Sequence, residues 1–212
     1  MKRSLAGWLL VCFVLAAHFG CDSQNLAGPE LVSYEALQRV DGSLTLDDER
    51  MHVVAVHFAS PRTPRGKLTF TPRGTTASDE DLRHLASFPQ LQRLSIRSPR
   101  ISDTGMAQLA GLERLETLRL PGAITDKGLQ HLGRLRVLDL IFTAVTDAGL
   151  VHLEGLAHLE QLLLLGTNVT DAGLEHLVGL RNLRHLVLNE TRVTDAGVAD
   201  LQKSLPNCKI EK

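Results

Sequence analysis

One short phrase occurs six times in this chain. From residue 78 onward, Ser or Thr is followed by Asp, and the most regular copies have the sequence Thr-Asp-Ala-Gly-Leu. The aspartates lie 24, 23, 21, 24 and 24 residues apart. They are Asp79, Asp103, Asp126, Asp147, Asp171 and Asp195. A period of this size indicates one supersecondary unit stacked on copies of itself, which builds a long surface rather than a catalytic cleft.

The copy at residues 146–169 predicts how each unit folds. Thr146 is a favoured helix N-cap, and Asp147 follows at the positive end of the helix dipole. Leucines then recur at helical spacing, and Leu162 and Leu164 alternate as in a strand. Each unit is therefore expected to be a strand, a turn and a short helix, and only stacking can bury its leucines.

The pattern Leu-x-x-Leu-x-Leu-x-x-Thr-x-Val-Thr-Asp-x-Gly-Leu-x-x-Leu resembles the leucine-rich repeat family. It is most similar to the bacterial Thr-Asp-Ala-Gly-Leu type, which is close to the Cys-containing and ribonuclease-inhibitor-like repeats. Residues 159–177 and 183–201 match nearly in full. The resemblance implies an α/β solenoid, with short parallel strands on the concave side, short helices on the convex side, and protein binding as the usual role. It also implies that ladder threonines use their hydroxyls on backbone groups of neighbouring turns; these are Thr143, Thr167 and Thr191.

Two copies depart from the pattern. The second is one residue short near 120–124 and lacks its ladder threonine, and the third is three residues short at 133–137. We expect a local kink or a thinner convex side at the third copy. Deletion drift explains this irregularity most simply, and a binding role is the alternative.

The first twenty residues predict a secretory signal peptide. Lys2 and Arg3 precede an apolar run at 5–17, which is too short to span a bilayer. The following Phe19-Gly20-Cys21 and its polar continuation resemble a bacterial lipoprotein cleavage site. That resemblance implies an acylated Cys21 that anchors the protein to a membrane, at a periplasmic or cell-surface location. Ordinary secretion and an uncleaved anchor remain alternatives.

The remaining chain is expected to have three parts: a tether at 21–33, an N-terminal cap with an irregular first repeat at 34–77, and the leucine-rich repeats at 78–212. A solenoid needs such a cap because its first open edge would otherwise be exposed. Within the cap we expect a helix at 34–40 and strands at 44–46, 51–58 and 67–71.

Composition argues against several classes of function. Removal of Lys2 and Arg3 with the signal peptide changes the formal net charge from −1 to −3, so nucleic-acid binding is not expected. Aromatic residues make up 4% of the chain, too few for base-stacking platforms. Phosphate-loop, hydrolase-elbow and zinc-protease motifs are absent. We therefore expect a monomeric protein that is not an enzyme and uses no cofactor.

Several repeated positions invite a chemical interpretation. The histidine column suggests a metal site, but neighbouring helices pack about 8–10 Å apart, which favours a surface position. Helix capping explains the aspartates without an ion, and the glycines of the phrase suit close packing between copies. Cys208 is expected to be a small, partly buried residue. The column consists of His84, His131, His152 and His176.

The preferred binding site is the concave face, where the side chains between the strand leucines point outward. The apolar members of this face suggest an interaction site, although a face under weak selection or one covered by another copy would look similar. Besides Ser95 and Pro121, the predicted face consists of Arg93, Arg97, Thr117, Arg119, Asp139, Ile141, Gln161, Leu163, Leu165, His185, Val187 and Asn189. The sequence thus predicts a non-catalytic module that binds a protein partner. An intracellular adaptor-like or structural module and a metal-binding protein are the alternatives.

Overall fold

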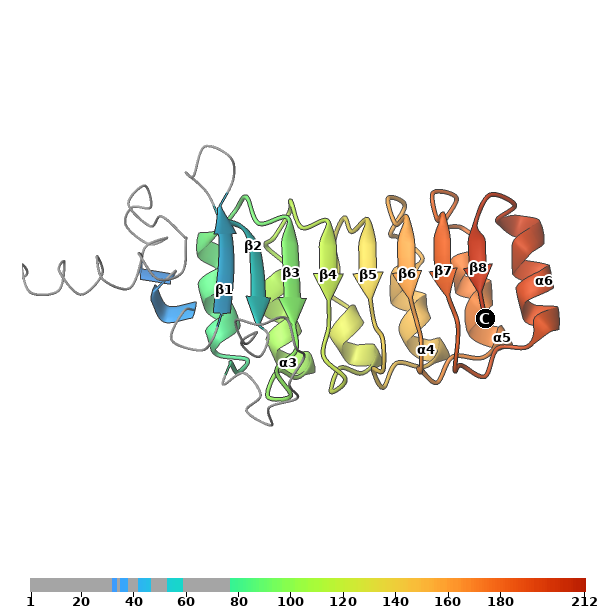
Figure 1. Cartoon of the computed structure of the whole chain (residues 1–212), viewed down its shortest axis with the longest axis horizontal. Coiled ribbons are helices and arrows are strands. Elements are labelled where there is room, and N and C mark those ends of the chain that lie inside the picture. Colours follow the sequence, from blue (N-terminus) through green and yellow to red (C-terminus); the bar gives the residue numbers. More distant parts are fainter. Residues whose placement is uncertain (1–31, 34, 38–41, 47–52, 59–76) are drawn as a thin grey trace, which may run out of the picture.

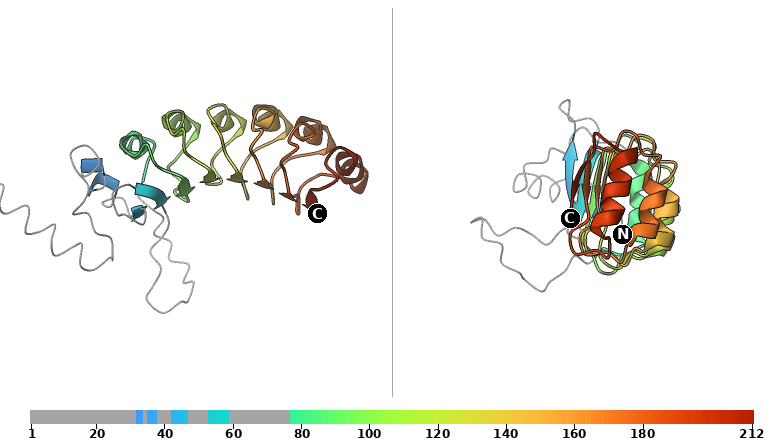
Figure 2. Two further views of the ribbon diagram at one scale, coloured as in Figure 1. Left: turned by 90° about the horizontal axis from the view of Figure 1, so that it is seen from above. Right: turned by 90° about the vertical axis from the view of Figure 1, so that its right-hand side faces the viewer.

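The computed structural model describes residues 32–33, 35–37, 42–46, 53–58 and 77–212. Their strands follow one another in sequence order across a single eight-stranded sheet (Figure 1). Figure 2 shows the strands along the inner side of an arc and the helical turns along its outer side. The predicted α/β solenoid is confirmed.

The sheet is parallel except at its first strand. β1 (Gly42–Leu46) is antiparallel to β2 (Val53–Phe58), and every later pair is parallel. Parallel pairing follows from the repeat, because each unit returns through its helical turn before the next strand begins. The strands expected at 44–46 and 51–58 correspond to β1 and β2, whereas 67–71 lies outside the described residues. The later strands are β3 (Arg93–Ile96), β4 (Thr117–Arg119), β5 (Val137–Asp139), β6 (Gln161–Leu163), β7 (His185–Val187) and β8 (Lys209–Glu211).

The helical side consists of short turns, each beginning at the Asp of the phrase or close to it. The third copy has only one four-residue turn, η4, so the predicted thinner convex side is confirmed. The sheet itself does not kink there, since Leu138 keeps its register with Leu118 and Leu162. The helical elements are η2 (Asp81–Ser87), α3 (Asp103–Met106), η3 (Ala107–Leu109), η4 (Asp126–Leu129), α4 (Asp147–Leu150), η5 (Val151–Leu153), α5 (Asp171–Leu174), η6 (Glu175–Leu177) and α6 (Asp195–Ser204).

One apolar core runs along the described chain from Leu37 to Cys208. Residues 32, 33 and 35–37 are helical, and the rest of the helix expected at 34–40 lies outside the described residues. Ser33 donates a hydrogen bond to the Ser87 hydroxyl at 2.9 Å, which ties this N-terminal turn to the first repeat.

A ladder of carboxylates joins neighbouring copies on the helical side. In the fourth copy, Asp147 accepts from both the amide and the hydroxyl of Thr170, each at 2.7 Å. The Thr170 hydroxyl also accepts from Ala172 N at 3.3 Å. Thr146 accepts from Ala148 N in the same way, so the predicted role of Thr146 as N-cap is confirmed. We call this bidentate contact of Asp147 the Asp–Thr rung. In the first rung of the chain, Ser102 takes the place of the threonine. The other rungs join Asp79 to Ser102, Asp103 to Thr125, Asp126 to Thr146, and Asp171 to Thr194.

The rungs explain the glycine that stands two residues after the Asp in every copy except the first. A Cβ atom built on Gly149 would lie 2.4 Å from Asp126 Oδ1, and one on Gly173 would lie 2.3 Å from Asp147 Oδ1. Real Cβ atoms do not approach this closely, so only glycine leaves room for the carboxylate. The predicted close packing between copies is confirmed.

The ladder threonines act within their own turns, which corrects the expectation that they bind neighbouring ones. The hydroxyls of Thr143 and Thr167 each donate to the carbonyl three residues earlier, at 2.7 Å, and Thr191 does the same at 2.6 Å. A threonine hydroxyl is too short to cross to the next copy, whereas the Asp carboxylate on the opposite side spans that gap.

Candidate protein-binding face

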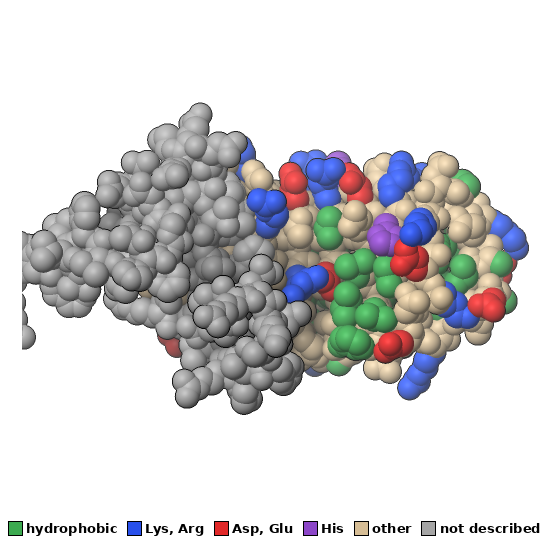
Figure 3. Space-filling view, viewed as in Figure 1, with side chains coloured by type: hydrophobic (Ala, Val, Ile, Leu, Met, Phe, Trp, Pro, Cys, Tyr) green, Lys and Arg blue, Asp and Glu red, His purple; other side chains and the backbone are tan. Residues whose placement is uncertain are grey.

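The concave face has an apolar centre bordered by charges. Leu163 of β6 and Val187 of β7 stand side by side in register, and Asp139 and Glu211 occupy the same row on the adjacent strands. In Figure 3 the hydrophobic side chains gather in the middle of the described part of this face, with acidic and basic side chains around them. The row therefore places an apolar contact area between polar borders.

The predicted apolar members are less exposed than expected. Ile141, Leu163, Leu165 and Val187 are all half-buried. Parallel strands stand about 4.8 Å apart, so the outward side chains of adjacent strands cover part of one another. Val137 of β5 is also half-buried on this face and was not among the predicted residues.

Asp139 does not point into solvent, which corrects the prediction. It is 4% exposed, and its carboxylate accepts from Arg119 Nε of the neighbouring strand and from Ile141 N at 3.1 Å. Arg119 is aligned with Asp139 in the sheet, so the long arginine folds over the short carboxylate and covers it. These two predicted contact residues thus form one ion pair at the border of the apolar row.

Pro121 is also buried rather than outward-facing. The second copy is one residue short, and its turn closes through a bond from Ile124 N to Pro121 O at 3.1 Å. The shortened turn brings the proline inward. The other predicted residues remain accessible: Arg93, Arg97 and Gln161 are exposed, and Ser95, Thr117, His185 and Asn189 are half-buried.

A second polar group borders the row at β8. Glu211 Oε1 lies 2.5 Å from Lys209 Nζ and 3.2 Å from His185 Nε2. The hydrogen bond from Lys209, followed by that from His185, lowers the pKa of the Glu211 carboxyl from its ordinary value. The carboxylate is therefore held in its charged form at neutral pH.

Phe142, which directly follows the strand residues of this face, is a second residue that was not predicted. It is 60% exposed, more than any other large hydrophobic side chain among residues 77–212. Its backbone is left-handed, with φ of 57°, which is strained for a bulky residue. Phe142 N nevertheless donates to Leu165 O at 2.8 Å, which extends the sheet pairing beyond β5.

The ring of Phe142 lies against Gly166. A Cβ atom built on that glycine would be 2.3 Å from the ring. The residue before the ladder threonine is left-handed in three successive copies, as Phe142, Gly166 and Glu190. This common position was the signal available in the sequence: a phenylalanine occupies a place that suits glycine.

The remaining predicted residues are the lipidation site, the histidine column and Cys208. Cys21 is outside the described residues. Within the described ranges no group of three or more His, Cys, Asp or Glu is placed to hold a metal ion, and His176 Nδ1 instead lies 2.6 Å from Glu154 Oε1. Cys208 is 4% exposed as expected, and burial raises the pKa of its thiol. Among the described helices, none has the length and apolar character needed to cross a membrane.

Comparison with known proteins agrees with the repeat. The family model described as Leucine Rich repeat matches residues 179–201. Among solved structures, the internalin inlF of Listeria monocytogenes is similar with a TM-score of 0.50 and 24% identity, over 61% of this chain and 37% of that one. This likeness concerns the fold alone. No curated protein sequence matches the chain.

Two further solved structures are similar at lower scores. Internalin C2 of Listeria monocytogenes gives a TM-score of 0.45 and 26% identity, over 60% of this chain and 55% of that one. The structure called PEPR1-AtPEP1 gives a TM-score of 0.43 and 18% identity, over 79% of this chain and 25% of that one. The chain thus spans about half or less of the length of these structures. The family match at residues 179–201 and the stacked strand-and-turn units together show a leucine-rich repeat solenoid.

Proposed function

We propose that the protein is an exported, lipid-anchored module without catalytic function that binds a protein partner through its concave sheet. The observation that carries the proposal is the apolar cluster on that face, with the exposed Phe142 at its edge. Leucine-rich repeat proteins bind other proteins as their usual role, which supports the general class.

The cluster has the composition of an interface centre. Leu163, Leu165, Val187 and Ile141 retain accessible apolar surface, and interface cores are depleted of charge while their rims are polar. The Arg119–Asp139 pair and the Lys209–Glu211 pair provide such a rim. A partner that buries the cluster gains apolar contact without leaving these charges unpaired.

Phe142 has the properties of an anchor residue. Aromatic side chains at the centre of interfaces contribute large apolar area with few rotatable bonds. Its left-handed backbone places the ring just beyond the C-terminal end of β5, against Gly166, and this conformation costs a non-glycine residue stability. Retention of a strained, exposed phenylalanine is best explained by contact with a partner.

Crosslinking in the native host tests the binding face. A photoreactive phenylalanine analogue at position 142 is expected to give an adduct of defined mass with a partner. The matched control is the same analogue at Val178, which is 45% exposed on the helical side. Equal adducts at both positions, or none at 142, would refute the concave site.

The substitution Phe142→Asn complements the crosslinking, because Asn tolerates the left-handed conformation and removes the ring. We expect capture of the crosslinked partner to fall at least tenfold, while Val178→Asn leaves it unchanged. Unchanged capture by Phe142→Asn would exclude the phenylalanine as anchor.

Lipid anchoring is tested separately by metabolic labelling with a radioactive fatty acid. The wild-type chain should carry the label and sediment with membranes, and Cys21→Ser should lose both properties. Membrane association of an unlabelled wild-type chain would instead support an uncleaved signal segment.

A further inference from the structure

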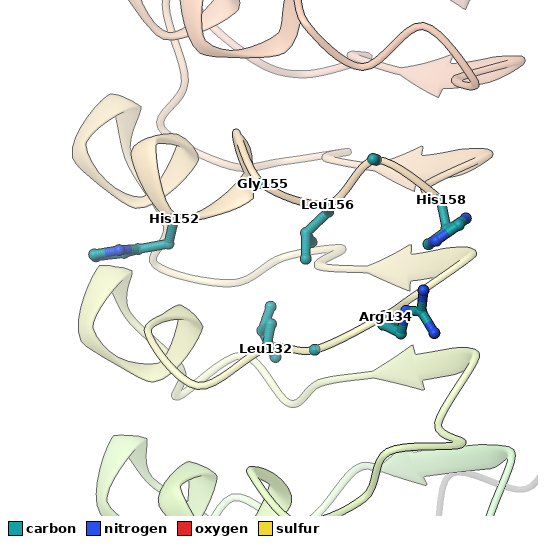
Figure 4. A pocket seen from close by; sticks show the side chains of 8 residues that line it. Leu132, Arg134, His152, Gly155, Leu156 and His158 are labelled. Atoms are coloured by element: carbon teal, nitrogen blue, oxygen red, sulfur yellow. The ribbon is translucent and has the colours of Figure 1, made fainter.

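A hollow of about 420 Å³ lies between the third and fourth copies, in the segments that lead into β5 and β6. Figure 4 shows Leu132 and Leu156 facing one another across it. Because Phe142 follows β5 whereas the hollow precedes it, the two sites lie at opposite ends of the strands. The hollow therefore belongs to neither the concave cluster nor its rim.

The hollow exists because the third copy lacks a leucine. In the second, fourth and fifth copies, a buried leucine stands at this position, as Leu112, Leu156 and Leu180. The third copy is three residues short there, so its sequence has no residue at this position. Leu132 is half-buried in consequence, whereas the equivalent Leu153 of the next copy is fully buried. The space thus lies where the leucine of the third copy would stand, and Leu132 and Leu156 border it.

The polar side chains that line the hollow can all donate hydrogen bonds, and Arg134 carries a positive charge. Arg134 and His158 lie close together at one side of it, and His152 lies at the other. No carboxylate lines the hollow. In the described part of the chain, Arg134 and His158 form no ion pair or hydrogen bond, so their donors are available.

We propose that the hollow binds an aliphatic carboxylate. A leucine-sized group would occupy the space between Leu132 and Leu156, where it removes apolar surface from water. The carboxylate would face Arg134, whose planar guanidinium can donate two parallel hydrogen bonds, with His158 beside it. The same chemistry is offered by a small branched acid and by a peptide that ends in leucine.

Two probes distinguish these sources. 4-Methylpentanoate represents the free acid, and N-acetyl-alanyl-leucine represents the peptide end, with its C-terminal amide as the uncharged comparison. Ligand-observed NMR titration of the full chain should show saturable binding of at least one acid and at least tenfold weaker binding of the amide. Binding of the small acid alone assigns a free ligand, and preferential binding of the peptide assigns a chain terminus.

Two substitutions test the location. Gly133→Leu fills the hollow, and a Cβ atom at Gly133 meets nothing within 4 Å, so the fold can accept it. Arg134→Gln removes the cation. Each should weaken binding of the acid at least tenfold. The matched controls are Gly111→Leu, which is equally open, and Arg114→Gln, at the equivalent place in the second copy; both should bind within twofold of wild type.

Absence of saturable binding for both acids would overturn the proposal. It would also be overturned if Gly133→Leu bound the acid as well as wild type, since the apolar seat would then be elsewhere. Melting curves of both variants establish that they are folded. Should either variant fail to fold, the other still decides the location.

Discussion

The third and fourth copies differ in their helical turns and agree in their strands and in their Asp–Thr rungs. The fourth has the continuous helical turn α4 and η5, whereas the third has only η4 and is three residues shorter on the way to its strand. Yet β5 keeps its register with β4 and β6, and the Asp126–Thr146 rung has the same 2.7 Å geometry as the Asp147–Thr170 rung.

This difference shows which contacts set the spacing of copies. The sheet hydrogen bonds and the Asp–Thr rungs are retained although the sequence separation across a rung falls to 20 residues at Asp126, against 23 at Asp147. By contrast, the flank, which is the segment between the helical turn and the strand, is three residues shorter in the third copy and has one leucine fewer. Two lines of polar contacts therefore define the repeat, and the flank adapts to them.

Leucine truncation should give the largest difference between the two copies. Leu153→Ala removes a fully buried side chain and should lower the free energy of unfolding by about 2–5 kcal/mol. Leu132→Ala, at the equivalent half-buried position, should cost about 1 kcal/mol because less apolar area is lost. Urea unfolding followed by circular dichroism measures both, and equal losses would mean that the third copy is as well packed as the fourth.

Removal of a rung carboxylate should instead affect both copies alike. Asp126→Ala and Asp147→Ala each leave a Thr amide and hydroxyl without their acceptor, which should cost about 1.5–3 kcal/mol. Asp195→Ala is the control, because that side chain is 98% exposed and is held by an exposed ion pair with Lys212 rather than by a rung. A much smaller loss at Asp126 than at Asp147 would break the claim that the rung is conserved across the irregularity.

Within one copy, adding a methyl group to a glycine should be costly beside the rung and harmless on the flank. Gly149→Ala brings a Cβ to 2.4 Å from Asp126 Oδ1 and 2.9 Å from Val145 Cγ1, so we expect a loss of about 1–2 kcal/mol in unfolding free energy. Gly155→Ala meets nothing within 4 Å and should be neutral or slightly stabilising. The same urea titration compares them. Neutral behaviour of Gly149→Ala would show that the rung can move aside.

The sequence predicted the repeat but not all of its contacts. Leucine spacing, the N-cap threonines and the short third copy correctly indicated strands, turns and a thinner convex side, since these follow from local patterns. The rungs were not foreseen, because an Asp beside an N-cap is already explained by the helix dipole within its own copy. Their partners lie 20–23 residues away and become visible only when the rise per copy is known.

The candidate binding face was predicted only in outline, because local patterns show which side chains point outward but not how neighbouring copies cover them. Strand alternation identified Leu163, Leu165 and Val187 as outward residues, but not how far their neighbours would cover them. The Arg119–Asp139 pair depends on lateral register, which period counting alone does not provide. Phe142 was missed because its significance lies in a left-handed backbone, and only comparison with Gly166 at the same place in the next copy hints at it.

The smallest expected effect is a dependence of stability on pH at the last rung. Hydrogen bonds from the Thr194 hydroxyl and then its amide lower the pKa of Asp171 below the ordinary value of 3.8. The unfolded chain therefore binds a proton more readily than the folded one, so this contribution is present above pH 3.8 and is lost as pH falls through the folded pKa. The urea midpoint of the wild type should decline more steeply between about pH 4 and pH 2 than that of Asp171→Asn, which has no ionisable group there. Thr194→Val, which removes the hydroxyl but keeps the amide, should give an intermediate slope. If the urea midpoints of all three proteins changed equally with pH, the charge of the Asp171 carboxylate would not contribute to the stability of the rung.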